Sequence, residues 1–544
     1  MRAESSIPDE KHVSLLYWSF FILTILTVVF IRLRLLGVPL ERDEGEYAYM
    51  GQLIAQGIIP YKDAYSMKLP GTAFMYYVIM SIFGKGIAGI HLGLTVVSLA
   101  VLPALFMLTK RLISERAATL ASASCAVISV SVPVFGLMAH ATHFVVFFAV
   151  WGVYFLYVAI EDNKTWLLAA SGLCLGMAFL MKQHGIFFIF FAITYLYITR
   201  VSIKNFIINA IILTLASALP FAITLFIIYR GGMLGNFWFW CFTYSGKYVS
   251  SLSLFDGLKR FTTMAPRMVK HFTAFWIFGV AGFFVLIKSQ IKTTAPHRLF
   301  ILLFFIFSFM SILPGLYFRE HYFVLIIPAI SISAAYCIEL LNNALTAKFK
   351  NKIIYTLPIA VLLSSLIFTF TVQGEIYFKL PPMEVSRKIY TLNPFIESVK
   401  IAEFLKSRTK DGDTIAILGS EPQILFYSGI RSATGYIYMY GLMEDQPYNL
   451  QMQKAMTAEI EKAMPAFIVF VNIPASWLPL KNTPLYIFDW ARNYIEANYV
   501  LTGVIDFIYY DDIVYKFDAE ALNYSPLSKI YICIYKLKYG GGHG

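Results

Sequence analysis

The chain has 544 residues, of which 58% are hydrophobic and only 14% charged, whereas soluble domains carry about 25% charged residues. This composition excludes an ordinary soluble protein and predicts an integral membrane protein. The formal net charge is +12, but the cations lie mostly between apolar runs, so we expect no nucleic-acid partner and interpret them as topology signals. The five cysteines are scattered without CxxC spacing, which predicts neither a disulfide framework nor a zinc site.

Apolar runs that could cross a bilayer as helices occupy most of residues 1–374. A helix needs about 20 mainly apolar residues to span roughly 30 Å of hydrocarbon. Such runs begin near residues 14, 86, 117, 143, 165, 186, 205, 271, 298, 321 and 352, which predicts about eleven transmembrane helices. No small-residue cleavage site follows the first run, so we expect an uncleaved span and not a signal peptide.

The apolar segment 71–84 decides the predicted topology. It follows Pro70 and is too short to cross comfortably, so it is either a short span or an interfacial helix. If it lies flat, the basic loops between later spans fall on the side of the N-terminus, as the positive-inside rule requires. This choice predicts a multi-pass protein of the inner or plasma membrane with a cytoplasmic N-terminus. The loops expected outside are 34–85, 182–185, 230–270 and 315–320.

After residue 374 the sequence changes to alternating apolar and polar residues, which predicts a soluble domain over 375–544 on the outer side. Asn393 and Pro394 are typical of the cap and first position of a helix. The runs "TIAILG" (414–419) and "FIVFV" (467–471) predict buried strands, and "IFDWARNYIEANY" predicts another helix. The expected fold class is therefore a polytopic α-helical membrane domain, 1–374, followed by a small extracytoplasmic α/β domain.

The first outer loop, 34–85, is unusually rich in charge. Asp43, Glu44 and Glu46 directly follow the first span, and Tyr47, Met50, Leu53 and Ile54 form an apolar face at helical spacing. Such a helix would lie on the membrane and hold Asp43 at headgroup depth. Lys68 precedes Leu69-Pro70, whose restricted backbone could aim it towards the same surface. An acid and a base near the interface would suit a reaction between a lipid phosphate and a hydroxyl, although a solvated loop is the plainer alternative.

Three stretches carry a resemblance to a known family. They are "RDEGEYAYMGQLIAQGIIPYKDAYSMKLPGTAFMYYVIMSIFG", "FLMKQHG" and "GLYFREHYFVLIIPAISISAA". In order and spacing they resemble the GT-C glycosyltransferases of the protein O-mannosyltransferase superfamily, and most closely the bacterial members that include the aminoarabinose lipid A transferases. The resemblance covers about the first 340 residues. It implies a GT-C-like membrane domain whose active site faces the outer side.

The resemblance also implies roles for residues of the first outer loop. The essential Asp-Glu pair of the family falls on Asp43 and Glu44, and its Lys/His-Pro-Pro element falls on Lys68, Leu69 and Pro70, with Leu69 in place of the first proline. Members use a sugar carried on a polyprenyl phosphate. The implied reaction is an inverting single displacement, with Asp43 as general base on the acceptor hydroxyl. Lys68 would bind the donor phosphate, where negative charge develops.

Two further cations are candidates for binding the donor phosphate. Arg319 lies in a short outer loop beside Glu320 and His321, and its alternative role is that of a snorkelling anchor. Lys182 lies in the outer turn "KQHG", and a charged side chain near membrane depth normally faces a polar cavity.

Histidines near the outer ends of spans are candidates for accessory roles. Imidazole is the commonest protein metal ligand, but HxxH spacing alone is weak evidence for a metal site. A divalent cation therefore stays open as a cofactor, and we expect no nucleotide cofactor. A solvated turn is preferred over a metal site for Asp511 and Asp512. The accessory candidates are His140, His143, His184 and His321.

The predicted function is a membrane glycosyltransferase of the cell envelope. Its partners would be a polyprenyl-phosphate-linked sugar donor, membrane lipids and a glycan, lipid or protein acceptor. The alternative is a transporter or flippase of lipid-linked saccharides. Transporters tend to show internal repeats and charges near the midplane, whereas this sequence shows no evident repeat and gathers its charges near the predicted outer rim. A structural assembly factor would leave the acidic first loop unexplained.

Overall fold

Two groups of residues pack into separate compact units in the computed structural model, which describes residues 10–290, 296–349 and 352–538. Unit 1 comprises the described residues of 1–36, 90–226 and 249–380, and unit 2 those of 37–89, 227–248 and 381–544. The chain enters unit 2 for the last time at residue 381. The first outer loop thus packs in the same unit as the C-terminal residues.

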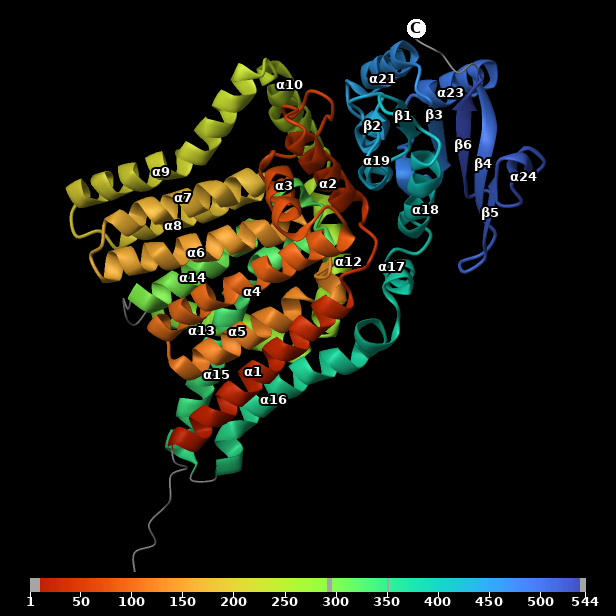
Figure 1. The fold of residues 1–544 in the computed structure, drawn as a ribbon. Coiled ribbons are helices and arrows are strands. Elements are labelled where there is room, and N and C mark those ends of the chain that lie inside the picture. Colours follow the sequence, from red (N-terminus) through yellow and green to blue (C-terminus); the bar gives the residue numbers. More distant parts are fainter. Residues whose placement is uncertain (1–9, 291–295, 350–351, 539–544) are drawn as a thin grey trace, which may run out of the picture. The chain divides into compact units, whose positions relative to one another are not determined.

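Every described element of unit 1 is a helix (Figure 1). The helices packed around α15 include α5, α13, α14 and α16. The elements are α1 (Glu10–Arg34), α4 (Ile87–Leu112), α5 (Glu115–Ser129), η1 (Val132–Val134), α6 (Ala141–Glu161), α7 (Trp166–Met181), η2 (Gln183–Gly185), α8 (Ile186–Ile198), α9 (Ile203–Arg230, ending in unit 2), α12 (Leu254–Lys270), α13 (Thr273–Gln290), α14 (Pro296–Met310), η4 (Pro314–Leu316), η5 (Glu320–Ile326), α15 (Ile327–Lys348), α16 (Lys352–Val372) and η6 (Glu375–Lys379).

Small residues bring the helices of unit 1 close together. A Cβ atom at Gly282 of α13 would lie 2.2 Å from the carbonyl oxygen of Ser333 in α15. The Ser333 hydroxyl donates a hydrogen bond of 2.7 Å to the Gly279 carbonyl across the same interface. Lipid-embedded helices cannot gain much from burying apolar surface against one another, so close backbone approach and hydrogen bonds of this kind drive their association.

A helix lies at each of the eleven positions where a span is expected, namely α1, α4, α5, α6, α7, α8, α9, α13, α14, α15 with η5, and α16. Among the described residues, five helices are long and apolar enough to cross a membrane by themselves, or six if the bent pair α12 and α13 counts as one span. Others, such as α7 and α14, are apolar but shorter. The number of spans therefore stays a prediction.

Unit 2 contains a mixed six-stranded sheet with the order β2-β1-β3-β6-β4-β5. β1 pairs in parallel with β2 and β3, and the other pairings are antiparallel. The strands are β1 (Thr414–Leu418), β2 (Arg431–Ser432), β3 (Phe467–Asn472), β4 (Tyr499–Phe507), β5 (Ile513–Phe517) and β6 (Tyr531–Leu537). Strands β1 and β3 are mostly buried, as expected of parallel strands covered on both faces.

The helices of unit 2 come from all three of its chain segments. They are α2 (Arg42–Ala55), α3 (Gly71–Phe83), α10 (Leu234–Trp238), η3 (Phe239–Tyr244), α11 (Ser245–Val249), α17 (Pro382–Tyr390), α18 (Phe395–Lys406), α19 (Pro422–Ser428), α20 (Tyr440–Met443), α21 (Asn449–Ala463), α22 (Pro474–Trp477), α23 (Tyr486–Asn498) and α24 (Ala519–Leu522). Helix α2 packs on α3 and on α19 (Figure 1). A Cβ atom at Gly45 would lie 2.6 Å from the backbone nitrogen of Gln423, so only glycine permits this approach of α2 to α19.

The predicted helix cap at Asn393 is wrong. Helix α18 begins at Phe395 with Pro394 in the cap position and no side-chain cap hydrogen bond. The Asn393 amide oxygen instead accepts a hydrogen bond of 3.2 Å from Arg42 Nη2, and its amide nitrogen donates to the Tyr390 carbonyl. A tertiary contact thus takes the oxygen that would have capped the helix.

Candidate active site

Asp43 and Lys68 form an ion pair within unit 2. Lys68 Nζ lies 2.8 Å from Asp43 Oδ1 and 2.6 Å from Glu46 Oε2. Asp43 and Glu46 are three residues apart on α2, so both carboxylates lie on one face of that helix. The side chains of Lys68 and Asp43 are each 21% exposed, whereas that of Glu46 is 3% exposed. One ammonium group is therefore shared by two carboxylates, one of them partly accessible.

The surroundings of Lys68 keep it charged and in place. Burial disfavours its ammonium form, but the Asp43 and Glu46 carboxylates outweigh burial and raise the pKa of Lys68 well above the usual lysine value. Its ammonium also lies 4.5 Å from the ring centre of Tyr47, a favourable cation–π distance. Its backbone N–H donates to Ser66 Oγ at 3.1 Å, and its carbonyl accepts from the Tyr61 hydroxyl at 2.8 Å.

Glu44 caps helix α2. Its carboxylate accepts a hydrogen bond of 3.1 Å from the backbone N–H of Glu41, and the Glu41 carboxylate accepts one of 2.9 Å from the N–H of Glu44. This reciprocal pair is a capping box, which satisfies two backbone donors at the start of a helix. Burial, followed by the charges of Asp43 and Glu44, raises the pKa of Glu41 well above its usual value. The contacts of Glu44 thus fix the turn that carries Asp43.

Tyr438 of the C-terminal segment touches both members of the ion pair. Its hydroxyl donates a hydrogen bond of 3.2 Å to Asp43 Oδ1, and its ring centre lies 5.4 Å from Lys68 Nζ. Burial and the Asp43 charge raise the pKa of Tyr438 well above its usual value, so the hydroxyl stays protonated and able to donate. Tyr438 is not among the residues predicted from the sequence. The alternation of tyrosines at 436, 438 and 440 is the signal that could have drawn attention to it.

Arg42 fastens the start of α2 to the C-terminal segment. Its guanidinium pairs with Glu421 Oε1 at 2.9 Å, and both side chains are buried. It also donates to the Ser420 carbonyl at 2.5 Å, to the Tyr440 hydroxyl at 2.9 Å and to Asn393 Oδ1 at 3.2 Å. Glu421 Oε2 in turn accepts from the Ser476 hydroxyl at 2.6 Å. Arg42, the residue before Asp43, is therefore held by four hydrogen bonds of its side chain.

In unit 1, most of the other predicted site residues gather around Tyr322. Lys182 Nζ lies 4.0 Å from the centre of its ring. The rings of His184 and His321 lie 4.7 Å and 4.8 Å from it, and the His140 ring stacks on that of His321 at 4.2 Å. His184 Nδ1 also contacts the Ser311 carbonyl at 2.6 Å. The turns η2 and η5 and the start of α6 thus bring four predicted residues together.

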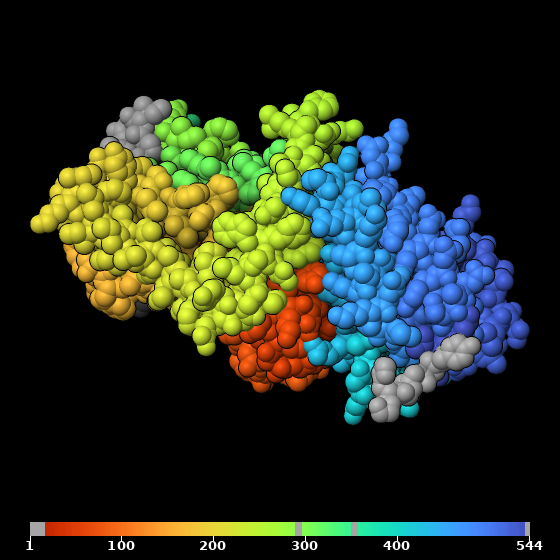
Figure 2. Space-filling view, turned by 90° about the horizontal axis from the view of Figure 1, so that it is seen from above, coloured from red at the N-terminus to blue at the C-terminus, as the bar shows by residue number. Residues whose placement is uncertain are grey.

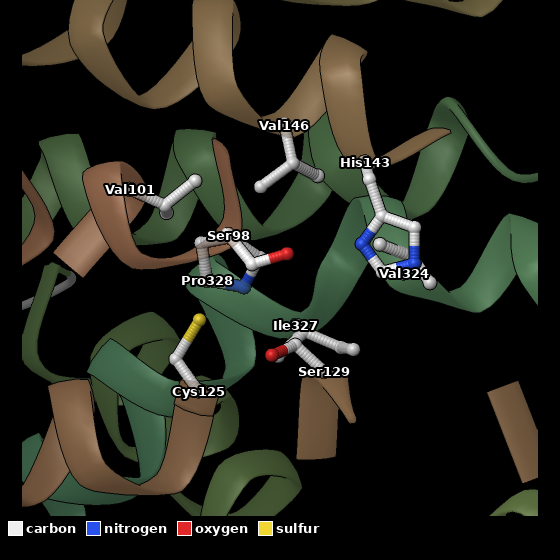
Figure 3. A pocket seen from close by; sticks show the side chains of 9 residues that line it. All are labelled: Ser98, Val101, Cys125, Ser129, His143, Val146, Val324, Ile327 and Pro328. Carbon is white, nitrogen blue, oxygen red and sulfur yellow. The ribbon is translucent and has the colours of Figure 1, made fainter. Parts of the chain in front are cut away.

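The side chains of the other two predicted residues, Arg319 and His143, contact different neighbours. The Arg319 guanidinium lies 5.6 Å from the ring centre of Tyr317 and precedes η5. His143 lines a small cavity of about 20 Å³ together with Ser98, Ser129 and Val324 (Figure 3). Within the described residues its Nε2 is buried without a hydrogen-bond partner. A cavity of this size can hold a water molecule, and His143 is one of the polar groups that line it.

Comparisons with known proteins identify the fold of this chain. The sequence matches the family described as dolichyl-phosphate-mannose-protein mannosyltransferase over residues 67–227. The structure resembles ArnT from Cupriavidus metallidurans in the apo state, with a TM-score of 0.60 at 14% identity, over 96% of this chain and 98% of that one. This chain has the GT-C glycosyltransferase fold. The predicted fold class and the resemblance noted in the sequence are confirmed.

Other GT-C structures are similar to a comparable degree. ArnT from C. metallidurans bound to undecaprenyl phosphate matches with a TM-score of 0.58 at 14% identity, over 84% of this chain and 93% of that one. AglB, the archaeal oligosaccharyltransferase from Archaeoglobus fulgidus in complex with an inhibitory peptide and a dolichol-phosphate, matches with a TM-score of 0.57 at 13% identity, over 94% and 75%. None of the curated proteins compared with the chain matches it.

Proposed function

We propose that this protein is a membrane glycosyltransferase that moves a sugar from a polyprenyl-phosphate carrier to a hydroxyl of an envelope glycan, lipid or protein on the outer face of the membrane. The family match and the GT-C fold support glycosyl transfer. The structures of ArnT with undecaprenyl phosphate and of AglB with a dolichol-phosphate support a lipid-phosphate donor. The observation that carries the proposal is the ion pair of Asp43 with Lys68, partly exposed and held from the C-terminal segment by Tyr438.

Asp43 acts as the general base in this proposal. Its carboxylate takes the proton of the acceptor hydroxyl as the hydroxyl oxygen forms a bond to the anomeric carbon. The bond from that carbon to the phosphate oxygen breaks in the same step, and its electron pair leaves with the polyprenyl phosphate. Because attack and departure occur on opposite faces of the sugar, the anomeric configuration inverts. A carboxylate is a sufficient base because deprotonation is concerted with attack.

The departing phosphate needs more positive charge than Lys68 alone provides. Asp43, Glu46 and Lys68 together carry one net negative charge, since two carboxylates share one ammonium. The phosphate gains a further negative charge as it leaves, so additional cations must stabilise it. We assign Arg319 and Lys182 to this task and His140, His184 and His321 to accessory contacts. A divalent cation would serve the same purpose, because carboxylate oxygens and imidazole nitrogens are suitable ligands for one.

The experiment compares envelope fractions of cells that produce wild-type protein, Asp43→Asn, Asp411→Asn or no protein. Asp43→Asn keeps the size of the side chain but removes the base, so we expect a loss on the order of a hundredfold or more. Asp411 is exposed, and Asp411→Asn is the matched control that should stay active. Mass spectrometry of envelope glycans, lipids and proteins measures the transferred sugar at equal membrane levels of each variant.

An assay with purified protein tests the alternative of a transporter. A transporter would move lipid-linked saccharides without forming a new glycosidic bond, so purified protein given a polyprenyl-phosphate sugar and the acceptor would form no glycosyl product. Full modification by the Asp43→Asn protein would remove the proposed base. Movement of a lipid-linked saccharide by reconstituted wild-type protein, with no glycosyl product formed, would contradict the enzyme assignment.

A further inference from the structure

Helix α12 (Leu254–Lys270) is packed against unit 1 along one face. Gly257 and Met268 are buried on this face. A Cβ atom at Gly257 would lie 2.6 Å from Leu316 Cβ, so the helix backbone meets η4 directly. The ring of Phe261 lies 5.0 Å from that of Phe318 on the same side. Contacts with η4 and Phe318 therefore fix which face of α12 is turned towards the rest of unit 1.

A second face of α12 is apolar and exposed. Leu254, Phe255 and Leu258 are 78%, 76% and 60% exposed, respectively. At 3.6 residues per turn, Leu254 and Leu258 lie one above the other and Phe255 lies beside them. In Figure 2 the yellow-green stretch of chain that contains α12 lies on the molecular surface. A contiguous exposed apolar face of this kind marks an interaction surface.

The third face of α12 is cationic. It carries Lys259, Arg260, Arg267 and Lys270, whereas Asp256 is the one acid of the helix and accepts a hydrogen bond of 2.6 Å from Ser253 Oγ. These cations lie on the side of the helix away from Leu254 and Leu258, and Thr263 lies among them. An exposed apolar face next to a cationic face is the pattern of helices that lie in a membrane interface.

The direction of α12 relative to the next helix agrees with such a position. The axes of α12 and α13 are bent by 114° at a short break. Helix α13 is apolar and exposes Ile277 and Phe284 by 59% and 62%, as a lipid-facing span does. If α13 crosses the membrane near its normal, α12 lies close to the membrane plane, with its apolar face continuing the lipid-facing surface of α13.

We propose that α12 is an interfacial helix that binds anionic phospholipids of the surrounding bilayer. Leu254, Phe255 and Leu258 enter the boundary between headgroups and acyl chains. The four cations bind the phosphate and other anionic groups of the lipid heads. A protein partner fits less well. In an anionic membrane the charged headgroups lie above the apolar acyl chains, and the cationic and apolar faces of α12 match these two layers. This inference rests on the membrane location of unit 1 and not on the proposed reaction.

The lipid contact would reach the loop of Arg319 through a shared aromatic ring. Arg260 of α12 and Arg319 lie 5.3 Å and 5.6 Å from the ring centre of Tyr317. The hydroxyl of Tyr317 also contacts Ser251 Oγ, ahead of α12, at 2.8 Å. Movement of α12 at the membrane surface would therefore displace Tyr317, and with it the segment that positions Arg319.

The experiment measures the depth of single nitroxide labels on the full-length protein reconstituted in vesicles. Leu258→Cys reports the apolar face and Thr263→Cys the cationic face. Both are made with Cys174→Ala, since Cys174 is the native cysteine that is not buried. In vesicles of phosphatidylcholine with phosphatidylglycerol, we expect the label at 258 to collide with oxygen in the acyl region and the label at 263 to collide with a water-soluble nickel complex. Equal exposure of both labels to water would overturn the proposal, and a spectrum that changes with protein density would assign the face to a second copy of the chain.

A second measurement tests the choice of anionic lipid. Lys259→Gln with Arg267→Gln removes two exposed cations while leaving the packed face of α12 unchanged. Because each basic residue near an anionic surface contributes about 1 kcal/mol, the preference of the protein for phosphatidylglycerol over phosphatidylcholine should fall roughly thirtyfold. Native mass spectrometry of bound lipids measures this ratio. Lys481→Gln with Lys529→Gln, two cations of unit 2, is the charge-matched control. An unchanged ratio in the α12 variant would contradict headgroup binding by this helix.

Discussion

The ion pair of Arg42 with Glu421 makes a testable link between the C-terminal segment and the turn that carries Asp43. Glu421 is completely buried and Arg42 nearly so, and their charged atoms lie 2.9 Å apart. Glu421→Gln keeps the shape of the side chain but leaves the Arg42 guanidinium without its buried counter-charge. We expect helix α2 to be held less firmly as a result.

The size of the effect follows from the contacts that remain. Removing one partner of a buried ion pair costs about 3–5 kcal/mol, because the other charge stays buried without compensation. Arg42 keeps three neutral acceptors in the variant, namely the Ser420 carbonyl, the Tyr440 hydroxyl and Asn393 Oδ1. The cost should therefore lie at the lower end, about 3 kcal/mol, which corresponds to a factor of about 150 in the opening equilibrium of α2.

Hydrogen exchange of the α2 amides measures this opening. Glu520→Gln is the control. The Glu520 side chain is 69% exposed and that of its partner Lys516 is 36% exposed, and exposed ion pairs contribute only about 0–1 kcal/mol. The double variant Arg42→Met with Glu421→Met should recover part of the loss, since no buried charge is left alone. Unchanged exchange of α2 in Glu421→Gln would refute the view that this ion pair fastens the active-site turn.

Three further predictions concern single groups. Tyr438→Phe removes the donor to Asp43 and should lower the transfer rate by about tenfold, as expected for one hydrogen bond to a charged group. Tyr436→Phe is the control and should transfer at the wild-type rate. Equal transfer rates of the Tyr438→Phe and wild-type proteins would exclude a role for the Tyr438 hydroxyl. Arg319→Lys keeps the charge but loses the bidentate fork that matches a phosphate, so transfer should fall at constant membrane level, and normal rates in both Arg319→Lys and Arg319→Ala would make Arg319 an anchor. A reporter that is active only outside the cytoplasm, fused after Gly374, should be active if the basic loops fix the topology, and a silent reporter would invert it.

The features that could be predicted from the sequence are those set by local composition. Apolar runs predicted a helix at each of eleven places, because a lipid-exposed backbone must satisfy its hydrogen bonds within the helix. Strands β1 and β3 followed from short apolar runs of β-branched and aromatic residues. The carboxylate face of α2 also followed from spacing, since Asp43 and Glu46 are three residues apart.

Features set by distant contacts could not be predicted in the same way. Asn393 has the composition of a helix cap, yet Arg42, 351 residues away in the sequence, takes its oxygen. Tyr438 reaches Asp43 across 395 residues. Tyrosines alternate along the sequence at 436, 438 and 440, but this alternation does not indicate which of the three faces a carboxylate.

These distant contacts of Arg42, Asn393, Asp43 and Tyr438 indicate a structural role for the C-terminal segment. A general base works only when its carboxylate is held within hydrogen-bonding reach of the reacting hydroxyl, and Asp43 lies in the first turn of α2, where the position of the helix start decides where the carboxylate lies. Here the residue before Asp43 is bound by Glu421, Ser420 and Tyr440, and Asp43 itself by Tyr438. The C-terminal segment thus contributes to the candidate site by holding Asp43, the proposed base.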